Sequence, residues 1–149
     1  LYHHYKSTHD ILYDIMMMGN EHRNEVIMEF VSANSNLSKK DIIVELLTDK
    51  ILDRNEYKSL YAMFLLECKK NEKYRKLYER LRRDTCENYK KPAEKLGIDV
   101  LKLFESPEFE MFMNGIILAI EYLDNGSVLS QKRQLIREFI KCFVDKHLI

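Results

Sequence analysis

Apolar residues recur along most of this chain at the three-to-four-residue spacing of amphipathic α-helices. The spacing is clearest in residues 57–68, where the apolar positions are Tyr57, Leu60, Tyr61, Phe64, Leu65 and Cys68. Similar patterns predict helices over about residues 8–31, 39–51, 54–68, 72–91, 107–124 and 129–146. Residues 98–105 are too short and too mixed to predict more than a helical turn. The chain is therefore expected to form about six helices.

Helix-capping residues stand at the expected starts of these segments. Ser7, Ser38 and Asp53 are each followed by a carboxylate side chain at the third position after them. In such an arrangement the first side chain accepts a hydrogen bond from a free backbone N–H, and the carboxylate lies at the positive end of the helix dipole. Ser106 is followed by Pro107, which suits the first position of a helix because no N–H is needed there.

The 149 residues include only four glycines and two prolines, too few for the many tight turns of a β-sandwich or barrel. We expect breaks between helices at Pro92, at Gly97 and at Asn125-Gly126. With 46% hydrophobic residues, the chain is long enough to bury a core of its own. The predicted fold class is all-α.

The last two predicted helices are more apolar than a single core requires. Residues 107–124 carry apolar side chains nearly all round, so this helix is expected to be buried on two sides. One side would face the chain's own core and the other a second copy, so that the last two long helices form a dimeric four-helix bundle. The expected dimer-interface residues are Met111, Gly115, Leu118, Tyr122, Ile136, Phe139, Ile140 and Phe143.

The 24 basic and 24 acidic side chains cancel, which argues against non-specific binding to a polyanion. The balance is segmental, since residues 69–91 carry ten basic and four acidic side chains while the segments on either side are acidic. Cys68, Cys86 and Cys142 are too widely spaced for a zinc ribbon or a disulfide framework. No apolar run approaches the roughly 20 residues that span a bilayer. We therefore expect a cytoplasmic protein without a membrane partner.

The most specific motif stands at the start of the chain. It reads Leu1-Tyr2-His3-His4-Tyr5-Lys6-Ser7, followed directly by Thr8-His9-Asp10-Ile11-Leu12. This segment resembles the boundary between the recognition helix and the next helix in the tetracycline-repressor (TetR) family of transcriptional regulators. Family members typically have Leu-Tyr-aromatic-His-Phe there, then a polar loop ending in Lys, an acidic pair and two apolar residues. The chain departs from this pattern at Thr8, where the family usually has Lys.

The TetR resemblance implies that residues 1–7 are the C-terminal end of a helix-turn-helix DNA-binding domain, most of which would precede Leu1. Residues 8–149 would then form a ligand-binding and dimerisation domain. The resemblance assigns Tyr2, His4 and Lys6 to DNA contact, and their phenol, imidazole and ammonium groups all donate to phosphate oxygens. The implied function is a homodimeric transcriptional repressor whose affinity for operator DNA falls when a small-molecule effector binds the helical domain.

A pocket for an apolar or aromatic effector is expected where methionine and aromatic side chains from several helices converge, because such side chains adapt to flat, apolar molecules. The same side chains also build any helical core, so packing alone is the alternative interpretation. His22 shares a helix face with Met18 and Val26 and suits either a core histidine or a ligand contact. The expected pocket residues are Met17, Met18, His22, Tyr61, Phe64, Tyr78, Phe112 and Met113, and Met16 belongs to the same methionine run.

Other functions have less support in the sequence. His3, His4 and His9 lack a Cys or carboxylate at metal-ligand spacing, and the short motifs of common enzyme classes are absent, so no metal, cofactor or enzymatic activity is expected. The basic residues 69–91 are interleaved with tyrosines, as in nucleic-acid-binding stripes, but those tyrosines share the face of Leu77 and Leu81. The main alternative function is a helical adaptor that binds another protein through its C-terminal helices.

Overall fold

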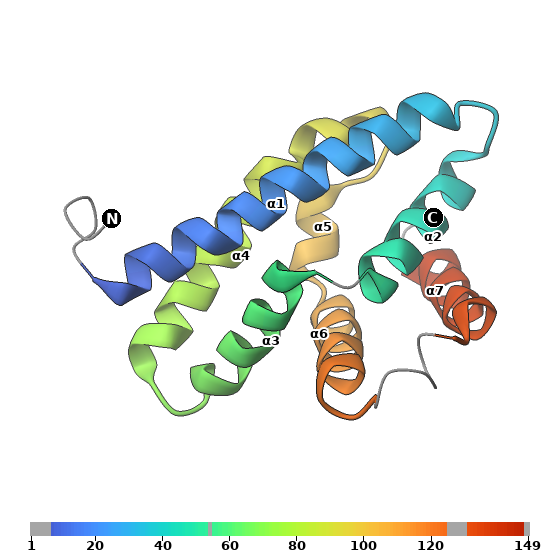
Figure 1. Cartoon of the computed structure of the whole chain (residues 1–149). Coiled ribbons are helices and arrows are strands. Elements are labelled where there is room, and N and C mark those ends of the chain that lie inside the picture. The colour runs from blue at the N-terminus through green and yellow to red at the C-terminus, as the bar shows by residue number, and fades with distance from the viewer. Residues whose placement is uncertain (1–6, 54, 125–130, 148–149) are drawn as a thin grey trace.

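The computed structural model describes residues 7–53, 55–124 and 131–147, and every regular element in these ranges is a helix (Figure 1). The helices are α1 (Thr8–Ala33), α2 (Lys39–Leu52), α3 (Glu56–Cys68), α4 (Glu72–Lys95), α5 (Val100–Glu105), α6 (Pro107–Tyr122) and α7 (Arg133–His147). The all-α fold class is confirmed for this part of the chain, which has α5 in addition to the six expected helices. α7 begins later than Leu129, and the stop expected at Asn125-Gly126 lies outside the described residues.

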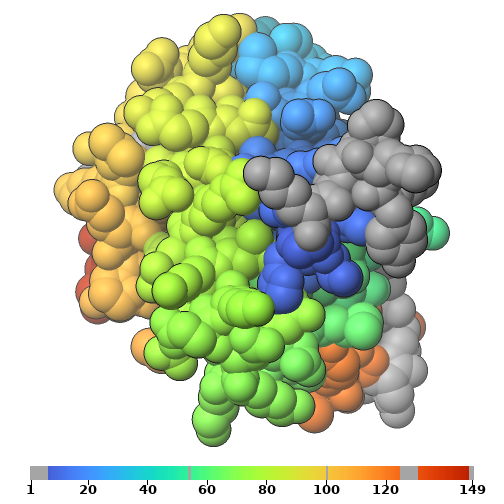
Figure 2. Space-filling view, turned by 90° about the vertical axis from the view of Figure 1, so that its left-hand side faces the viewer, coloured from blue at the N-terminus to red at the C-terminus, as the bar shows by residue number. Residues whose placement is uncertain are grey.

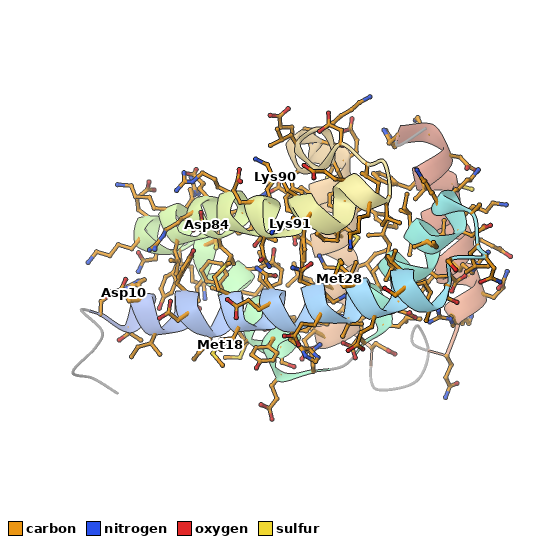
Figure 3. All side chains as sticks on the ribbon, turned by 90° about the horizontal axis from the view of Figure 1, so that it is seen from above. Asp10, Met18, Met28, Asp84, Lys90 and Lys91 are labelled. Atoms are coloured by element: carbon orange, nitrogen blue, oxygen red, sulfur yellow. The ribbon has the colours of Figure 1, made fainter. Side chains whose placement is uncertain are left out.

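Two long helices, α1 and α4, form the frame of the molecule. They lie side by side and run in the same direction (Figures 1 and 3). α3 packs against both of them and against α6, while α5 packs against α4 and α6. α2 packs mainly against α7, and this pair lies at the other end of the molecule from the start of α1 (Figure 1).

Apolar side chains collect in two main clusters. The larger includes the fully buried Ile140 and Val144 of α7 together with side chains of α2 and α6, and the smaller joins α1, α3 and α4 through Met16, Phe64 and Leu81. Burying one such side chain contributes about 1.5–3 kcal/mol, so these clusters supply most of the favourable free energy of folding. The pocket described below borders both clusters.

Serine side chains cap three of the helices as expected. Ser7, Ser38 and Ser106 each accept a hydrogen bond from the backbone N–H three residues later. The expectation for Asp53 is wrong, because this residue ends α2 and Asn55 caps α3 instead. Asn55 Oδ1 accepts a hydrogen bond from the backbone N–H of Lys58 at 2.9 Å. Asp and Asn cap helices about equally well, so the sequence did not separate two candidates that stand two positions apart.

The expected break at Pro92 is also wrong, since this proline lies inside α4. It stands in the last turn of the helix, where the missing N–H removes a single backbone hydrogen bond. The chain turns instead at Gly97, whose φ of 68° lies in the left-handed region. The N–H groups of Gly97 and Ile98 donate to the carbonyls of Glu94 and Ala93 at 3.1 and 2.9 Å, which is the Schellman arrangement that ends many helices.

Two mid-helix glycines are expected to have opposite effects on stability. A Cβ on Gly19 of α1 would lie 2.9 Å from the Cβ and Cγ of Tyr57 in α3, whereas a Cβ on Gly115 of α6 would meet no atom within 4 Å. We expect Gly19→Ala to lower the free energy of unfolding by about 1–3 kcal/mol, because overpacking outweighs the gain in helix propensity. Gly115→Ala is the matched control and, at a protein concentration where the chain is monomeric, should raise it by about 0.5–1 kcal/mol. Urea denaturation at one protein concentration measures both, and a Gly19→Ala variant as stable as the wild type contradicts the close approach of α1 and α3.

Candidate functional site

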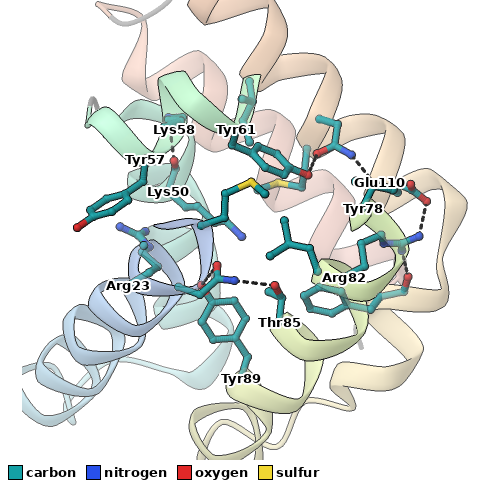
Figure 4. A pocket seen from close by; sticks show the side chains of 18 of the residues that line it. Arg23, Lys50, Tyr57, Lys58, Tyr61, Tyr78, Arg82, Thr85, Tyr89 and Glu110 are labelled. Atoms are coloured by element: carbon teal, nitrogen blue, oxygen red, sulfur yellow. Dashed lines mark hydrogen bonds and ion pairs between the residues drawn. The ribbon is translucent and has the colours of Figure 1, made fainter. Parts of the chain in front are cut away.

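A partly open cavity of about 180 Å³ lies where α1, α3, α4 and α6 meet (Figure 4). Its wall includes Met16 from α1, Tyr61 from α3, Leu81 from α4 and Met113 from α6, and the end of α2 contributes Lys50. Pockets for drug-sized ligands commonly have roughly 300–1,000 Å³. This cavity therefore suits a small molecule.

Three residues that the sequence assigned to a pocket lie on the cavity wall, namely Tyr61, Tyr78 and Met113. The methionine run reaches the wall through Met16, which is 5% exposed, rather than through Met17 or Met18. Met18 is 54% exposed and lies on the side of α1 that faces away from α4 (Figure 3).

The other three assigned residues lie elsewhere. His22 is exposed and borders a separate groove that also includes Val26. Phe64 is buried inside the smaller apolar cluster, and Phe112 stacks on Phe143 with ring centroids 5.4 Å apart. The apolar pattern of a helix correctly predicted that Phe64 points inward, but it did so wrongly for Met18 and His22, and it does not identify which inward side chains border an unfilled space.

A chain of hydrogen bonds crosses the α6 side of the cavity. The Tyr61 hydroxyl donates to Asn114 Oδ1 at 2.8 Å, and Asn114 Nδ2 donates to the Tyr78 oxygen at 3.0 Å. The Tyr78 hydroxyl donates to Glu110, whose other oxygen accepts from Arg82 Nη1 at 2.8 Å. Arg82 also donates to a backbone carbonyl of α5, so the network joins α3, α4, α5 and α6. A polar network with its members paired in this way makes a rigid wall.

The opposite side of the cavity carries an ammonium group. Lys50 stands in the last turn of α2 and points its ammonium into the cavity (Figure 4). The Nζ atom lies 5.6 Å from the ring centroid of Tyr89, and it has no hydrogen bond or ion pair with any described residue. Burial, and then the charges of Arg23 and Lys58, lower the pKa of Lys50 to about 8. A desolvated ammonium without an anionic partner destabilises a fold, so stability does not account for its position.

Lys58 and Arg23 hold the end of α2 beside this ammonium. Lys58 Nζ donates to three backbone carbonyls at the end of the helix, among them those of Lys50 at 2.9 Å and Asp53 at 2.8 Å. These carbonyls have no partner within the helix, and a cation also favours this negative end of the dipole. Arg23 Nη2 donates to the carbonyl of Leu46 at 2.8 Å, and its Nη1 lies 3.9 Å from an Asp53 oxygen.

Asn20 joins α1 to α4 on the cavity wall. Its Nδ2 donates to Thr85 Oγ1 at 2.6 Å, and its Oδ1 accepts from the Tyr89 hydroxyl at 3.4 Å. Burial raises the pKa of Tyr89 to about 12 and also raises the pKa of Tyr61. Burial, together with the hydrogen bond to a carboxylate, raises the pKa of Tyr78. All three phenols therefore remain neutral hydrogen-bond donors near neutral pH.

Sequence reasoning missed the polar residues of this site. Asn114 carried a usable signal, since it is the one amide in the apolar helix α6 and a buried amide needs partners. Lys50 carried no sequence signal of a position at the cavity, because lysines in the last turn of a helix are common at protein surfaces. Its burial depends on α1 and α3, which come from other parts of the chain.

The groups on the cavity wall suit recognition of a ligand. Among the described lining residues there is no histidine or cysteine, and hydroxyl, amide and cationic groups are interspersed with apolar ones. Groups of this kind orient a small molecule by hydrogen bonds and charge. In the described parts of the chain, no three His, Cys, Asp or Glu side chains stand close enough together to hold a metal ion.

An apolar surface remains on the outer sides of α6 and α7. Met111 is 73% exposed, Phe139 60% and Tyr122 46%, while Gly115 is exposed and Leu118 is half-buried. All five were expected at a dimer interface. We call these five residues the C-terminal apolar surface.

The remaining interface expectations need correction. Ile136 and Ile140 are only 6% and 0% exposed within the single chain, because α7 turns this side onto α2. Phe143 is half-buried and packs against Phe109 and Phe112 of α6. The apolar side of α7 therefore mainly serves the chain's own core.

The residues assigned to DNA contact, Tyr2, His4 and Lys6, lie outside the described residues. His3 lies there as well, so its part in a metal site is not addressed by the structure. The ring of His9 lies 4.7 Å from the ring of Tyr74, which fixes the start of α1 to the start of α4.

The basic segment 69–91 forms much of α4, whose outer face is seen in Figure 2. Tyr89 on this helix is buried, while Arg80 and Arg83 are exposed and lie 3.8 and 4.0 Å from Asp84. The Arg80 guanidinium also stacks over the Tyr13 ring at 4.0 Å. The tyrosines of this segment are buried or half-buried, so this face lacks the exposed aromatic platform of single-strand-binding proteins.

Comparison with known proteins finds no match to a family model, to a curated protein or to a solved structure. None of the described helices is long and apolar enough to cross a membrane. The motif at the start of the chain and the geometry of the cavity are therefore the features that bear on function.

Removing the unpaired charge of the half-buried Lys50 is expected to stabilise the fold in a pH-dependent way. Lys50→Met should raise the free energy of unfolding by on the order of 1 kcal/mol at pH 7, because a methionine at this position needs no water or counter-charge. The pKa of Lys50 is about 8 in the folded chain, against 10.5 for an exposed lysine. The destabilisation is full below pH 8 and is lost as the pH rises from 8 to 10.5, so the advantage of the variant should shrink over that range.

Urea denaturation at pH 7 and pH 10 measures this difference. Lys76→Met, on the exposed side of α4, is the matched control and should change stability by less than about 0.5 kcal/mol at both pH values. A Lys50→Met variant that is less stable than the wild type at pH 7 contradicts the burial of an unpaired charge.

Proposed function

We propose that this chain is the effector-binding and dimerisation part of a DNA-binding transcriptional repressor resembling the TetR family. Residues 1–7 would close a helix-turn-helix domain that contacts operator DNA, and residues 8–149 would bind a small effector. The observation that carries the proposal is that α1 connects the motif to the cavity. It begins directly after its cap Ser7, the last residue of the segment 1–7, and it supplies Met16, Asn20 and Arg23 to the cavity wall.

The position of the cavity supports a switch that acts through α1. Met16 lies about 12 Å along the helix from Thr8, at a rise of 1.5 Å per residue. A ligand that moves α1 against α4 would therefore also move Ser7 and the segment before it. For affinity to fall, the effector has to bind more tightly to the conformer whose two DNA-binding ends no longer fit the operator.

The C-terminal apolar surface supports a homodimer. Exposed apolar side chains on α6 and α7, such as Met111 and Phe139, are more stable when a partner covers them. A Cβ atom placed on Gly115 would meet no atom within 4 Å, so a second helix has room to approach closely. Two copies joined through α6 and α7 would present two DNA-binding ends, as a two-fold-symmetric operator requires.

DNA binding is tested by titrating the full-length protein with duplex DNA from the region upstream of its own gene. Binding is expected to be sequence-selective and to weaken with salt, because phosphate contacts release counterions. Lys6→Ala should weaken binding several-fold and reduce the slope of log K against log salt by about 1. Fluorescence anisotropy between about 50 and 200 mM salt measures both quantities.

The matched control for this experiment is Lys102→Ala, which removes an exposed lysine of α5 and should change neither affinity nor slope. Equal affinity for the upstream region and for random DNA rules out the proposed function. A Lys6→Ala variant with the wild-type slope removes Lys6 from the phosphate contacts.

Dimerisation is tested by placing a charge on the C-terminal apolar surface. Phe139 is 60% exposed, so Phe139→Glu should leave the fold intact while burying an unpaired carboxylate in any interface. The sedimentation mass is expected to fall from that of a dimer to that of a monomer. Leu101→Glu, at a 50% exposed leucine of α5, is the matched control and should remain dimeric.

A wild-type chain that sediments as a monomer contradicts the dimer. That result would favour the adaptor function, in which the same apolar surface binds a different protein.

A further inference from the structure

Positive charge predominates on the cavity wall. The charged residues that line it are Arg23, Lys50, Lys58, Arg82, Asp53 and Glu110. Four of these side chains are cationic and two are carboxylates, so the described wall has an excess of positive charge. Such an excess in a desolvated site favours an anionic ligand.

The four cations differ in how far the protein already satisfies them. Arg82 is paired with Glu110 at 2.8 Å, and Lys58 donates to backbone carbonyls at the end of α2. Lys50 has no hydrogen bond or ion pair with a described residue, and Figure 4 shows its ammonium in the middle of the cavity. Lys50 is therefore the group that a ligand can satisfy.

Arg23 offers a second donor on the same side. Its side chain is 13% exposed, and its Nε is buried without a hydrogen-bond partner although its other nitrogens contact Leu46 and Asp53. Buried N–H groups in proteins nearly always have an acceptor. The charge of Arg23 also contributes to the lowered pKa of Lys50, so the two cations are neighbours.

We propose that this cavity binds a small monocarboxylate with an apolar body of about one ring, and that its carboxylate accepts hydrogen bonds from Lys50 and Arg23. The inference rests on the proposed function in that it takes the cavity as the effector site. The apolar body would lie against Met16, Leu81 and Ile117, which line the same cavity.

Other classes of ligand fit the same wall less well. A neutral ligand leaves the Lys50 ammonium unpaired, and an organic cation adds to the positive charge. A phosphate monoester brings a second charge and a third oxygen, while the Lys50 ammonium and the buried Arg23 Nε are two cationic donors that the described wall leaves without an acceptor. The cavity of about 180 Å³ also excludes large ligands.

Calorimetric titration of the full-length protein with benzoate tests the inference, with benzamide as the neutral isostere and benzylamine as the cationic one. At pH 7 benzoate is expected to bind about tenfold or more tightly than benzamide, and benzylamine is expected not to bind. Lys50→Met should weaken benzoate binding by about tenfold or more and leave benzamide binding unchanged. Lys76→Met, the matched surface control, should change neither.

Proton uptake gives a second readout that a purely structural role of Lys50 would not produce. At pH 8.5 an ammonium with a pKa of about 8 is partly neutral, so pairing with a carboxylate draws a proton from the buffer. The groups near it are Arg23 from α1, Lys58 from α3, Tyr89 from α4 with a pKa of about 12, and Asp53, the residue that follows its own helix. Titrations in two buffers of different ionisation enthalpy measure the uptake, which should vanish in Lys50→Met.

The inference is overturned if benzamide binds as tightly as benzoate, or if Lys50→Met weakens both ligands equally. It is also overturned if neither benzoate nor the aliphatic octanoate binds. Operator affinity reports on the proposed function separately. If benzoate binds through Lys50 and operator affinity is the same with and without it, the ligand class stands and the switching function fails. If DNA binding is selective but the carboxylates do not bind, the function stands and the ligand class fails.

Discussion

The parallel packing of α1 against α4 is the constraint on which the rest of the structure depends. Ring contact between His9 and Tyr74 sets the register near the start of both helices, and hydrogen bonds from Asn20 to Thr85 and Tyr89 maintain it further along. α3 then packs against both helices, and α6 packs against α3. The cavity lies where these four helices meet, so the register of the first two decides which side chains line it.

The two sides of the cavity differ in how well their polar groups are satisfied. On the α6 side, Tyr61, Asn114 and Tyr78 form a continuous chain of hydrogen bonds that ends on Glu110, and this network links helices that are distant in sequence. On the α2 side, the Lys50 ammonium lies near the Tyr89 ring and the cations Arg23 and Lys58, and it has no hydrogen bond or ion pair with a described residue. A core selected for stability alone would replace such a group by an apolar side chain. This asymmetry is the physical reason to regard the cavity as a binding site rather than as a packing defect.

Close packing and charge are combined where α2 ends and α3 begins, beside this cavity. Lys58 satisfies carbonyls at the end of α2, and its charge contributes to the lowered pKa of the neighbouring Lys50. Gly19 permits the close approach of Tyr57, which holds α3 against α1 beside the same cavity. Contacts among α1, α2 and α3 thus form the cationic side of the cavity. The apolar side of α7 packs against α2 in the larger apolar cluster instead.

The sequence by itself determined the helical class and three of the caps, because each depends on residues within about four positions. It placed Met18 and His22 on an inward face of α1, and both side chains are exposed. It predicted Tyr61, Tyr78 and Met113 at the cavity, but it also placed Phe64 and Phe112 there, since all of these stand on apolar helix faces. Only the tertiary structure decided which inward side chains border empty space, that Ile140 belongs to the core of the single chain, and that Lys50 lies at the cavity, where burial and neighbouring cations lower its pKa. These properties arise where helices far apart in the sequence meet, and no local pattern encodes that meeting.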